Sequence, residues 1–423
     1  MTEQVLALVD CNNFYASCER SFNPKLDRQP VVVLSNNDGC IIARSNEAKA
    51  LGFAMGDPYH LNRDKIRQHN VKVFSSNYAL YGDMSRRVMS TLAAFAQDVE
   101  IYSIDEAFLS LQGFEHRGLS RYAATIRSDV KRATGIPVSI GIGPTKTLAK
   151  IANRLAKKFP GTDGVFNLLE ADADTMLAQV DVADVWGVGR QWAAWLKGQG
   201  INTALDLKRA DPKTIRARMT VVGERIVSEL NGEACLDLEL VAPPQKGITV
   251  SRSFGRQLTD LEAIRQALLQ FVGRAGEKLR RQNLQALRLT VFLMTSPFAK
   301  DRPFYSNSMT RNLLFPTDYT PYLIDAATAI LEKIYRPGYV YQKCGVMLTD
   351  LVPAAGERHD LFDERDRQRQ SRLMKALDAI NSDHGARTIH YGDLGGANPQ
   401  WAMRAGFRSP RYTTRWGEIP LVR

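Results

Sequence analysis

Three carboxylates end or interrupt stretches of the sequence that otherwise have the composition of buried strands. Asp10 follows the apolar residues 5–9, and the pair Asp105 and Glu106 lies within the β-prone residues 99–111. An ionised carboxylate in apolar surroundings is costly unless a cation compensates its charge. Oxygen ligands without a nearby histidine favour Mg²⁺ over zinc. We therefore expect a magnesium site here, although one such acid alone is typical of a turn or a helix cap.

The adjacent acids Asp105 and Glu106 also place a demand on the backbone. Neighbouring residues on a regular strand point to opposite faces. The two side chains can converge on one site only if the strand bends between them, and such a local conflict tends to mark a functional site.

A cationic helix is expected to follow the strand-like run at residues 138–142. Residues 146–158 hold five cations and no acid: Lys146, Lys150, Arg154, Lys157 and Lys158. The apolar residues recur at helical spacing, and all of these cations but Lys158 share the opposite face. Metal ions combined with lysine and arginine clamps are the recurring equipment of phosphoryl transfer. Opposite the carboxylates, this helix would hold a triphosphate, so nucleotidyl or phosphoryl transfer is the expected chemistry. The absence of a Walker A loop excludes a P-loop ATPase.

The charge of the chain favours a polyanionic partner. The 423 residues include 56 Lys and Arg against 45 Asp and Glu, a net charge of +11. Residues 245–300 alone hold ten cations against three acids, a net of +7. A charge run is usually a solvated face, but two separate basic runs favour a track for phosphates.

Neither a membrane span nor a disulfide framework is expected. No apolar stretch reaches 18 residues, and the first residues lack the basic and long apolar regions of a signal peptide. The five cysteines are far apart, without C-x-x-C spacing or a histidine pair at zinc spacing. These observations indicate a cytoplasmic protein with reduced thiols.

The pattern along the chain changes several times. Strands and helices alternate through residue 165, and residues 172–232 are helical and polar. The pair Pro243-Pro244 indicates a linker. Residues 245–352 mix strand-like runs with two amphipathic helices, at about 260–281 and 321–335, and beyond residue 353 the sequence is polar with one helical stretch at 371–380.

Several motifs are recognisable as they stand. Asp10-Cys-Asn-Asn-Phe-Tyr15, Tyr102-Ser-Ile-Asp-Glu-Ala-Phe108 and Pro144-Thr-Lys-Thr-Leu-Ala-Lys150 together resemble the Y-family DNA polymerases. Three further segments are similar to the UmuC branch, the catalytic subunit of DNA polymerase V or its plasmid-borne relatives: Ser35-Asn-Asn-Asp-Gly-Cys40, Ser75-Ser-Asn-Tyr-Ala-Leu-Tyr81 and Ser409-Pro-Arg-Tyr-Thr-Thr-Arg415. The resemblance covers essentially the whole chain.

The resemblance implies an α+β multidomain fold. It has a ferredoxin-like palm (1–15 and 80–170), fingers (16–79), an all-helical helix-hairpin-helix thumb (171–242), an α+β little finger (245–352) and a UmuC-type tail (353–423). The implied function is template-directed, error-prone DNA synthesis across lesions in the SOS response, by two-Mg²⁺ nucleotidyl transfer from dNTP to a primer 3′-hydroxyl.

The resemblance also implies roles for residues at the catalytic centre. Asp10 and Asp105 would hold two Mg²⁺ ions, Glu106 would complete the site, and the main-chain carbonyl of Cys11 would add an oxygen. Tyr15 matches the aromatic steric gate beneath the sugar; without the motif it would be taken for a core tyrosine. The residues expected at the triphosphate are Lys157, Asn46 and Lys49, of which the last two replace the tyrosine and arginine of many relatives.

Further residues are implied at the DNA and at partner proteins. Gly187 and Gly189 would form a hairpin that approaches a DNA phosphate, and Arg252 and Arg256 would lie on a strand along the template. Leu361 and Phe362 would anchor a sliding-clamp peptide in which Arg358 replaces the usual glutamine. The implied partners are primer–template DNA, dNTP, the sliding clamp, a processed UmuD-like dimer and a RecA-like protein.

Two other classes of function stay open on the sequence. A catalytically silent DNA-binding scaffold would use the same basic surfaces to recruit repair proteins, but it would not need three carboxylates in costly surroundings. A metal-dependent cyclase or phosphatase on a similar palm-like fold would not need the basic residues 245–352.

Overall fold

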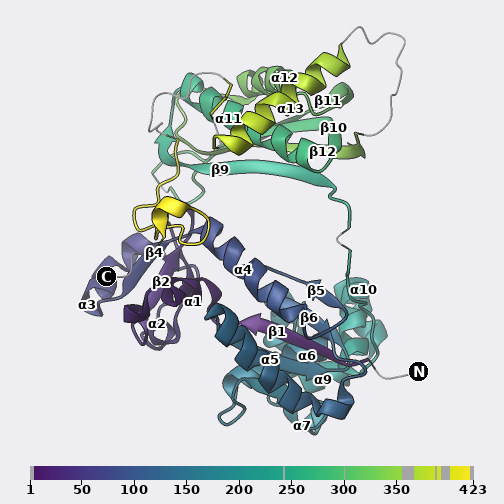
Figure 1. Cartoon of the computed structure of the whole chain (residues 1–423). Coiled ribbons are helices and arrows are strands. Elements are labelled where there is room, and N and C mark those ends of the chain that lie inside the picture. Colours follow the sequence, from purple (N-terminus) through teal and green to yellow (C-terminus); the bar gives the residue numbers. More distant parts are fainter. Residues whose placement is uncertain are drawn as a thin grey trace. The chain divides into compact units, whose positions relative to one another are not determined.

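The chain forms two compact units in a computed structural model, which describes residues 4–241, 243–299, 301–354, 366–385, 388–391 and 401–419 (Figure 1). The first unit comprises Met1–Ser35, Gly39–Ala242 and Phe407–Arg423, and the second comprises Asn36–Asp38 and Pro243–Gly406. Within the described ranges, no helix is both long and apolar enough to cross a membrane.

A mixed sheet with strand order β5-β6-β1-β7-β8 forms the centre of the first unit. Strand β1 pairs antiparallel with β6 on one side and β7 on the other. Helices α4 and α5 supply most of the helical core on one face of the sheet, and α6 packs on the other face. The bounds are β1 (Leu6–Cys11), β5 (Val99–Ile101), β6 (Glu106–Ser110), β7 (Val138–Gly143), β8 (Val165–Asn167), α4 (Tyr78–Leu92), α5 (Leu119–Thr134) and α6 (Lys146–Lys158).

The alternation of side chains along β1 decides where its acid points. Ala7 and Val9 belong to the core beneath α4 and α5, whereas Leu6 and Leu8 pack with Ala149 of α6. Because side chains on a strand alternate, Asp10 falls on the face that α6 covers.

The expectation of one strand-like run at residues 99–111 is wrong. The run is a hairpin, in which β5 and β6 pair antiparallel and residues 102–105 turn between them. The Ser103 hydroxyl accepts hydrogen bonds from the backbone N–H groups of Asp105 (3.1 Å) and Glu106 (3.0 Å). This turn supplies the bend that lets the two adjacent acids serve one site.

Helix α6 lies unusually close to β7. A Cβ atom on Gly141 would stand 1.9 Å from the backbone nitrogen of Asn153 and 2.5 Å from the carbonyl oxygen of Ala149. The Asn153 amide donates to the carbonyl oxygens of Leu8 (3.2 Å) and Ser139 (2.7 Å), which ties α6 to both strands. Only glycine at position 141 permits this approach.

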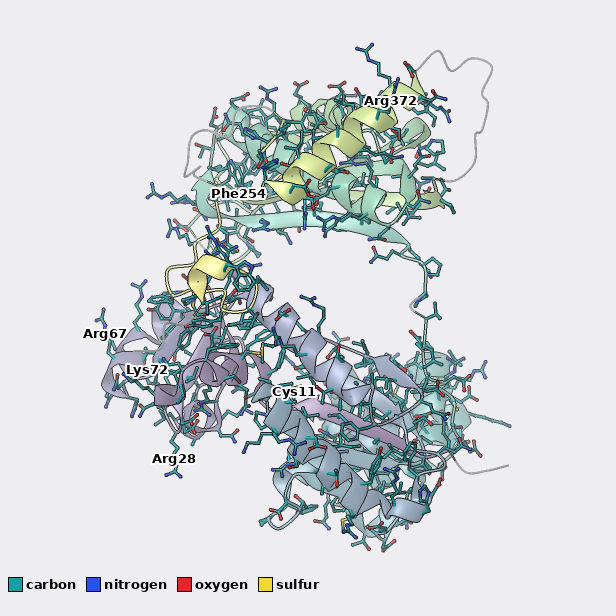
Figure 2. All side chains as sticks on the ribbon, in the orientation of Figure 1. Cys11, Arg28, Arg67, Lys72, Phe254 and Arg372 are labelled. Carbon is teal, nitrogen blue, oxygen red and sulfur yellow. The ribbon has the colours of Figure 1, made fainter. Side chains whose placement is uncertain are left out.

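A smaller sheet with strand order β3-β2-β4 carries short helices. Arg28 and Arg67 project outward from this region (Figure 2). The elements are α1 (Phe14–Ser21), β2 (Val31–Leu34), β3 (Ile41–Arg44), α2 (Asn46–Ala50), α3 (Arg63–Gln68) and β4 (Lys72–Ser75).

Residues 173–230 are helical, as their pattern predicts, and they share an apolar core with α6 through Leu148, Ile151 and Leu155. The helices are α7 (Ala173–Leu177), α8 (Arg190–Gly198), α9 (Ala204–Lys208) and α10 (Pro212–Leu230).

The second unit is an antiparallel sheet with strand order β11-β10-β12-β9, packed against helices α11 and α12. The two predicted helices are confirmed as α11 (Leu261–Arg281) and α12 (Thr320–Ile334). A third helix, α13 (Arg367–Asp383), contacts α11 through an ion pair in which Arg280 donates to both carboxylate oxygens of Asp378 (2.6 and 2.8 Å). The strands are β9 (Gly247–Leu258), β10 (Leu284–Thr295), β11 (Ser306–Thr317) and β12 (Tyr341–Pro353). Strand β11, which the sequence pattern misses, is mostly exposed and polar.

We predict that Gly141→Ala lowers the free energy of unfolding by about 3 kcal/mol or more, because the added methyl group meets the backbone of α6. Gly82→Ala is the matched control, since a Cβ at this position within α4 meets nothing within 4 Å. The control should leave stability unchanged or raise it by up to about 1 kcal/mol. Chemical denaturation of both variants measures the difference, and equal stabilities would contradict the close approach of α6 to β7.

Candidate active site

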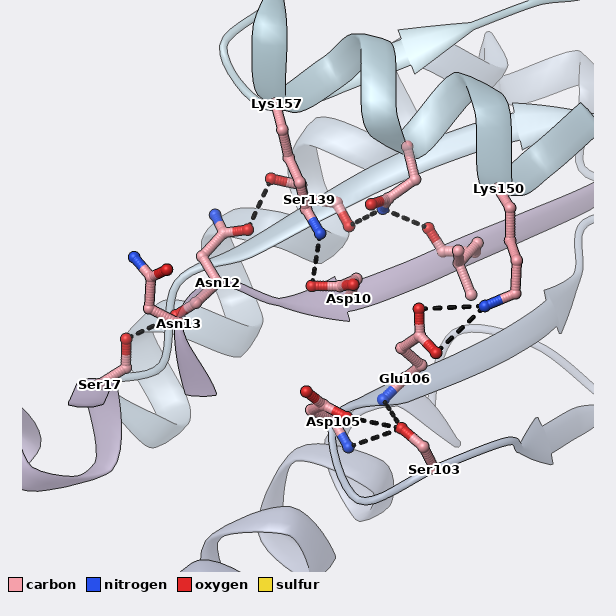
Figure 3. Close-up of polar contacts among 12 residues, drawn as sticks. Asp10, Asn12, Asn13, Ser17, Ser103, Asp105, Glu106, Ser139, Lys150 and Lys157 are labelled. Atoms are coloured by element: carbon pink, nitrogen blue, oxygen red, sulfur yellow. Dashed lines mark hydrogen bonds and ion pairs between the residues drawn. The ribbon is translucent and has the colours of Figure 1, made fainter. Parts of the chain in front are cut away.

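Two of the three expected acids lie side by side on neighbouring strands, and the third stands on the turn beside them. Asp10 of β1 is directly opposite Glu106 of β6 in the antiparallel register. The Asp105 carboxylate accepts a hydrogen bond from the Ser103 hydroxyl (2.6 Å), and the Asp105 carbonyl accepts one from the Cys11 N–H (2.8 Å). The sheet therefore brings together Asp10, Asp105 and Glu106 (Figure 3).

Helix α6 supplies one lysine to each strand acid (Figure 3). Lys157 Nζ lies 2.6 Å from Asp10 Oδ1, and Lys150 Nζ lies 3.1 Å from both carboxylate oxygens of Glu106. Lys150 also lies over the rings of Tyr102 (4.4 Å) and Trp186 (5.2 Å). These cation–π contacts fix the position of Lys150 more firmly than an ion pair alone would.

The surroundings of Asp10 disfavour its charged form. Burial raises the pKa of Asp10 to about 6; Lys157 opposes this rise, and the charges of Glu106 and Asp105 add to it. Like charges gathered in a partly dry site need a cation nearby.

The cationic face expected on α6 is only partly correct. Lys146 is buried rather than exposed, and its ammonium group pairs with the buried Glu100 carboxylate (2.5 Å). Arg154 pairs with Asp184. Of the predicted face, Lys150 reaches Glu106 and Lys157 reaches Asp10.

The donor chemistry suits a hard cation, although no metal-holding cluster is assembled. In the part of the chain that the structure describes, no three His, Cys, Asp or Glu side chains form a group that could hold a metal ion. Asp10 and Glu106 are engaged by Lys157 and Lys150 instead. Their oxygens and those of Asp105 are the ligands that Mg²⁺ prefers, so binding requires the acids to exchange these partners.

A cavity of about 360 Å³ opens beside the acids. Its lining includes Asp10 and Asp105 on one side, Tyr15 of α1, and Arg44 and Lys49 on the side of the small sheet. The Tyr15 ring stacks on Tyr81 with 4.4 Å between centroids. Asp10, Asp105, Tyr15 and Lys49 thus meet at one cavity.

The side of the cavity formed by the small sheet is organised by Asn13, which the sequence analysis did not single out. Lys49 Nζ donates to Asn13 Oδ1 (2.6 Å), and the Asn13 amide donates to Asn46 Oδ1 (3.0 Å). Burial lowers the pKa of Lys49, and the neighbouring Arg44 and Lys157 lower it further. Arg44, also missed, donates to the carbonyl oxygen of Phe53 (2.6 Å), and no sequence signal distinguished it from other arginines.

The Cys11 side chain takes no part in this cavity's charge. Its thiol is buried, and burial raises its pKa well above the usual range. Its N–H group joins β1 to the turn at Asp105. The backbone of Cys11, rather than its sulfur, is therefore the part that can serve the site.

The glycine hairpin before α8 has two distinct glycines. Gly187 has a φ of +89°, and a Cβ there would stand 2.8 Å from Ile226 Cδ1, so the turn requires glycine. Gly189 is exposed at the N-cap of α8, and a Cβ there would meet nothing within 4 Å. The N-terminus of this helix is open to a ligand at Gly189.

Two of the remaining expected residues belong to the second unit. Arg252 and Arg256 are exposed on β9, and Arg252 lines a second cavity of about 430 Å³ between β9, α11 and α13. Arg252 Nη1 lies 3.9 Å from Met403 Sδ. Leu361 and Phe362 lie outside the described residues.

Comparisons with known proteins agree with the geometry. Residues 9–154 match the impB/mucB/samB family, residues 245–361 match the C-terminal domain of that family, and residues 371–422 match a domain of unknown function. The chain is 47% identical to protein UmuC of Salmonella typhimurium over 99% of this chain and 100% of that protein. It is 28% identical to DNA polymerase IV of Moorella thermoacetica over 91% of this chain and 94% of that one.

The fold is that of solved polymerases. A Y-family DNA polymerase chimera of Dbh and Dpo4 superposes with a TM-score of 0.66 at 20% identity, covering 82% of this chain and 99% of the chimera. This likeness confirms the expected α+β multidomain fold. The chain belongs to the impB/mucB/samB family, the UmuC branch of the Y-family DNA polymerases.

Proposed function

We propose that this chain, an error-prone, template-directed DNA polymerase of the translesion type, joins dNTP to a primer end at the cavity lined by Asp10, Asp105 and Tyr15. One observation carries the proposal: two of the acids and the tyrosine line the same cavity, and the third acid lies opposite Asp10 on the next strand. A silent scaffold gives no reason for this juxtaposition, and a cyclase or phosphatase would not need the basic residues 245–352.

Divalent-metal dependence comes with the family, and the oxygen donors favour Mg²⁺. Asp10 and Asp105, with Glu106 and the main-chain carbonyl of Cys11, would hold two ions, which would activate the primer 3′-hydroxyl and neutralise the leaving pyrophosphate.

The chain's own side chains provide charge and shape. Lys157, which neutralises Asp10, would contact the triphosphate. Lys49, which lines the cavity and is linked to Asn46 through Asn13, would contact it as well. Lys150 lies over the rings of Tyr102 and Trp186, and from this position it holds the Glu106 carboxylate in a fixed orientation. The Tyr15 ring occupies the space that a ribose 2′-hydroxyl would need.

DNA binding is assigned to two further regions, the glycine hairpin before α8 and strand β9. Gly187 and Gly189 would present the open N-terminus of α8 to a phosphate, and the exposed Arg252 and Arg256 would contact the template backbone. With these assignments, residues 1–15 and 80–170 form the palm, 16–79 the fingers, 171–242 the thumb, 245–352 the little finger and 353–423 the tail.

Partner proteins belong to the proposal as well. A processed UmuD-like dimer, a RecA-like protein and a sliding clamp would bind this polymerase in the cytoplasm, the clamp at Leu361 and Phe362. Primer extension with and without the first two proteins tests whether the chain works alone.

We predict that Asp105→Asn or Glu106→Gln reduces nucleotide incorporation about a hundredfold or more, because each removes a negative charge that would hold the metal ions, and those ions would neutralise the transferring phosphates. Primer–template affinity should stay within a few fold, because basic surfaces elsewhere hold the DNA. Asp64→Asn is the control, since Asp64 lies on α3 with its side chain 99% exposed. Primer extension and equilibrium binding measure the two effects. Unchanged extension by both variants would reject the metal assignment, and a scaffold would show no extension in any form.

We predict that Tyr15→Ala incorporates ribonucleotides at least about tenfold better relative to deoxyribonucleotides, a shift of roughly 1.4 kcal/mol in the difference of barriers. A pocket excludes an added hydroxyl only when something rigid fills its space. Tyr15→Phe keeps the ring and should change selectivity less. Single-nucleotide extension with the two sugars in competition measures this. Unaltered selectivity in a folded, active alanine variant would make Tyr15 a core aromatic only.

A further inference from the structure

The described tail residues 407–419 belong to the first unit, where they dock beside β4 and the start of α4 (Figure 1). The backbone N–H of Ser75 donates to the carbonyl oxygen of Phe407 (3.1 Å), and the Phe407 N–H donates to the Ser75 hydroxyl (2.9 Å). Tyr412 stacks on Phe22 of the neighbouring segment, with 4.8 Å between ring centroids. The tail is thus held at two separate points.

Between these points the tail enters a buried polar cluster. The Asn77 amide donates to the hydroxyl and the carbonyl oxygen of Ser409 (both 3.0 Å) and to the carbonyl oxygen of Pro410 (3.2 Å). Asn77 is 2% exposed and Ser409 is 7% exposed, so these bonds are shielded from water. Buried polar groups of this kind must keep their partners.

Glu19 of α1 joins this cluster to the nucleotide cavity. It is 2% exposed, and one of its carboxylate oxygens accepts hydrogen bonds from the hydroxyls of both Ser409 (2.9 Å) and Tyr81 (2.7 Å). No cation among the described residues forms an ion pair with it. Burial raises the pKa of Glu19 to about 7, and the bonds from Tyr81 and Ser409 oppose this rise. The tail therefore supplies one of the two hydroxyl donors that make a buried carboxyl group tolerable.

Tyr81 carries the connection to the cavity. Its ring is fully buried and stacks on Tyr15 at 4.4 Å between centroids and 15° between planes. A hydroxyl held by Glu19 at one end fixes the plane of this ring, and the ring in turn supports Tyr15 from the side away from solvent.

We propose that the tail is a positioning element of the nucleotide pocket, in which Ser409 acts through Glu19 and Tyr81 to hold Tyr15 in place and so sets sugar selectivity. The proposal rests on the proposed role of Tyr15 at the sugar. Ser409 is a positioning residue, since it touches neither the nucleotide cavity nor the acids.

The test is competition between ribonucleotide and deoxyribonucleotide of the same base, with the chain alone or with its UmuD-like and RecA-like partners, whichever supports extension by the wild type. Ser409→Ala and Tyr81→Phe each remove one hydroxyl donor to Glu19. Each should raise the incorporation of ribonucleotide relative to deoxyribonucleotide about threefold to fivefold. This is the rate ratio that corresponds to the net free energy of one hydrogen bond. Ser409→Thr keeps a hydroxyl and should restore the wild-type ratio.

Two comparisons separate positioning from a general loss of structure. Trp416→Ala, a change in the same tail at a side chain that is 90% exposed, should leave the ratio unchanged. In a Tyr15→Ala background, Ser409→Ala should add nothing, because the residue it acts on is gone. If Ser409→Ala does not fold, the same competition between ribonucleotide and deoxyribonucleotide is measured with Tyr81→Phe and Tyr412→Ala.

A folded Ser409→Ala variant with the wild-type ratio would overturn the inference, as would an equal effect of Ser409→Ala with and without Tyr15. Failure of the proposed role of Tyr15 is distinguishable, because Tyr15→Ala would then leave selectivity unchanged by itself.

Discussion

The contact between helix α6 and strand β7 is the constraint on which the active site depends. Gly141 lets the helix backbone lie against the strand, and the Asn153 amide binds carbonyl groups of two strands at that point. The depth and rotation of α6 follow from this contact. They direct Lys150 and Lys157 toward the face of the sheet that carries Asp10 and Glu106. A more distant helix would leave both acids without a counter-charge.

Lys150 and Lys157 allow the carboxylates of Glu106 and Asp10 to lie close together before any substrate binds. Burial disfavours the charged form of Asp10, and the nearby carboxylates add to that effect, so the pairing with Lys157 stabilises the site in the absence of a metal ion. Lys150 is also enclosed by aromatic rings, one of which, Trp186, precedes the glycine hairpin. The helical residues 173–230, through Trp186, and the β5–β6 hairpin, through Tyr102 and Glu106, therefore both contact Lys150. Exchange of these lysine partners for metal is the step that would turn a charge-balanced site into a catalytic one.

Much of this arrangement was predictable from local sequence. Periodicity identifies α6, α11 and α12, the apolar runs identify Asp10 and Asp105, and the family resemblance implies Tyr15. The hairpin at residues 102–105 was missed because a serine side chain, rather than glycine or proline, makes the turn. Lys146 was misplaced because helical periodicity cannot show that a buried glutamate, 46 residues earlier, pairs with it. The bond between Ser409 and Glu19 spans 390 residues, which no local pattern reveals.

The central claim is that Asp10 and Asp105 bind metal ions when a nucleotide binds. Asp10 would then release Lys157, and Asp105 would release the Ser103 hydroxyl. The most direct measurement is a crystal structure of the chain with primer–template DNA, a non-hydrolysable dNTP and Mn²⁺, in which anomalous scattering locates the metal. The account predicts Mn²⁺ bound by carboxylate oxygens of Asp10 and Asp105, with Lys157 moved from Asp10 to the triphosphate. Mn²⁺ bound elsewhere, with Lys157 still paired to Asp10, would contradict it.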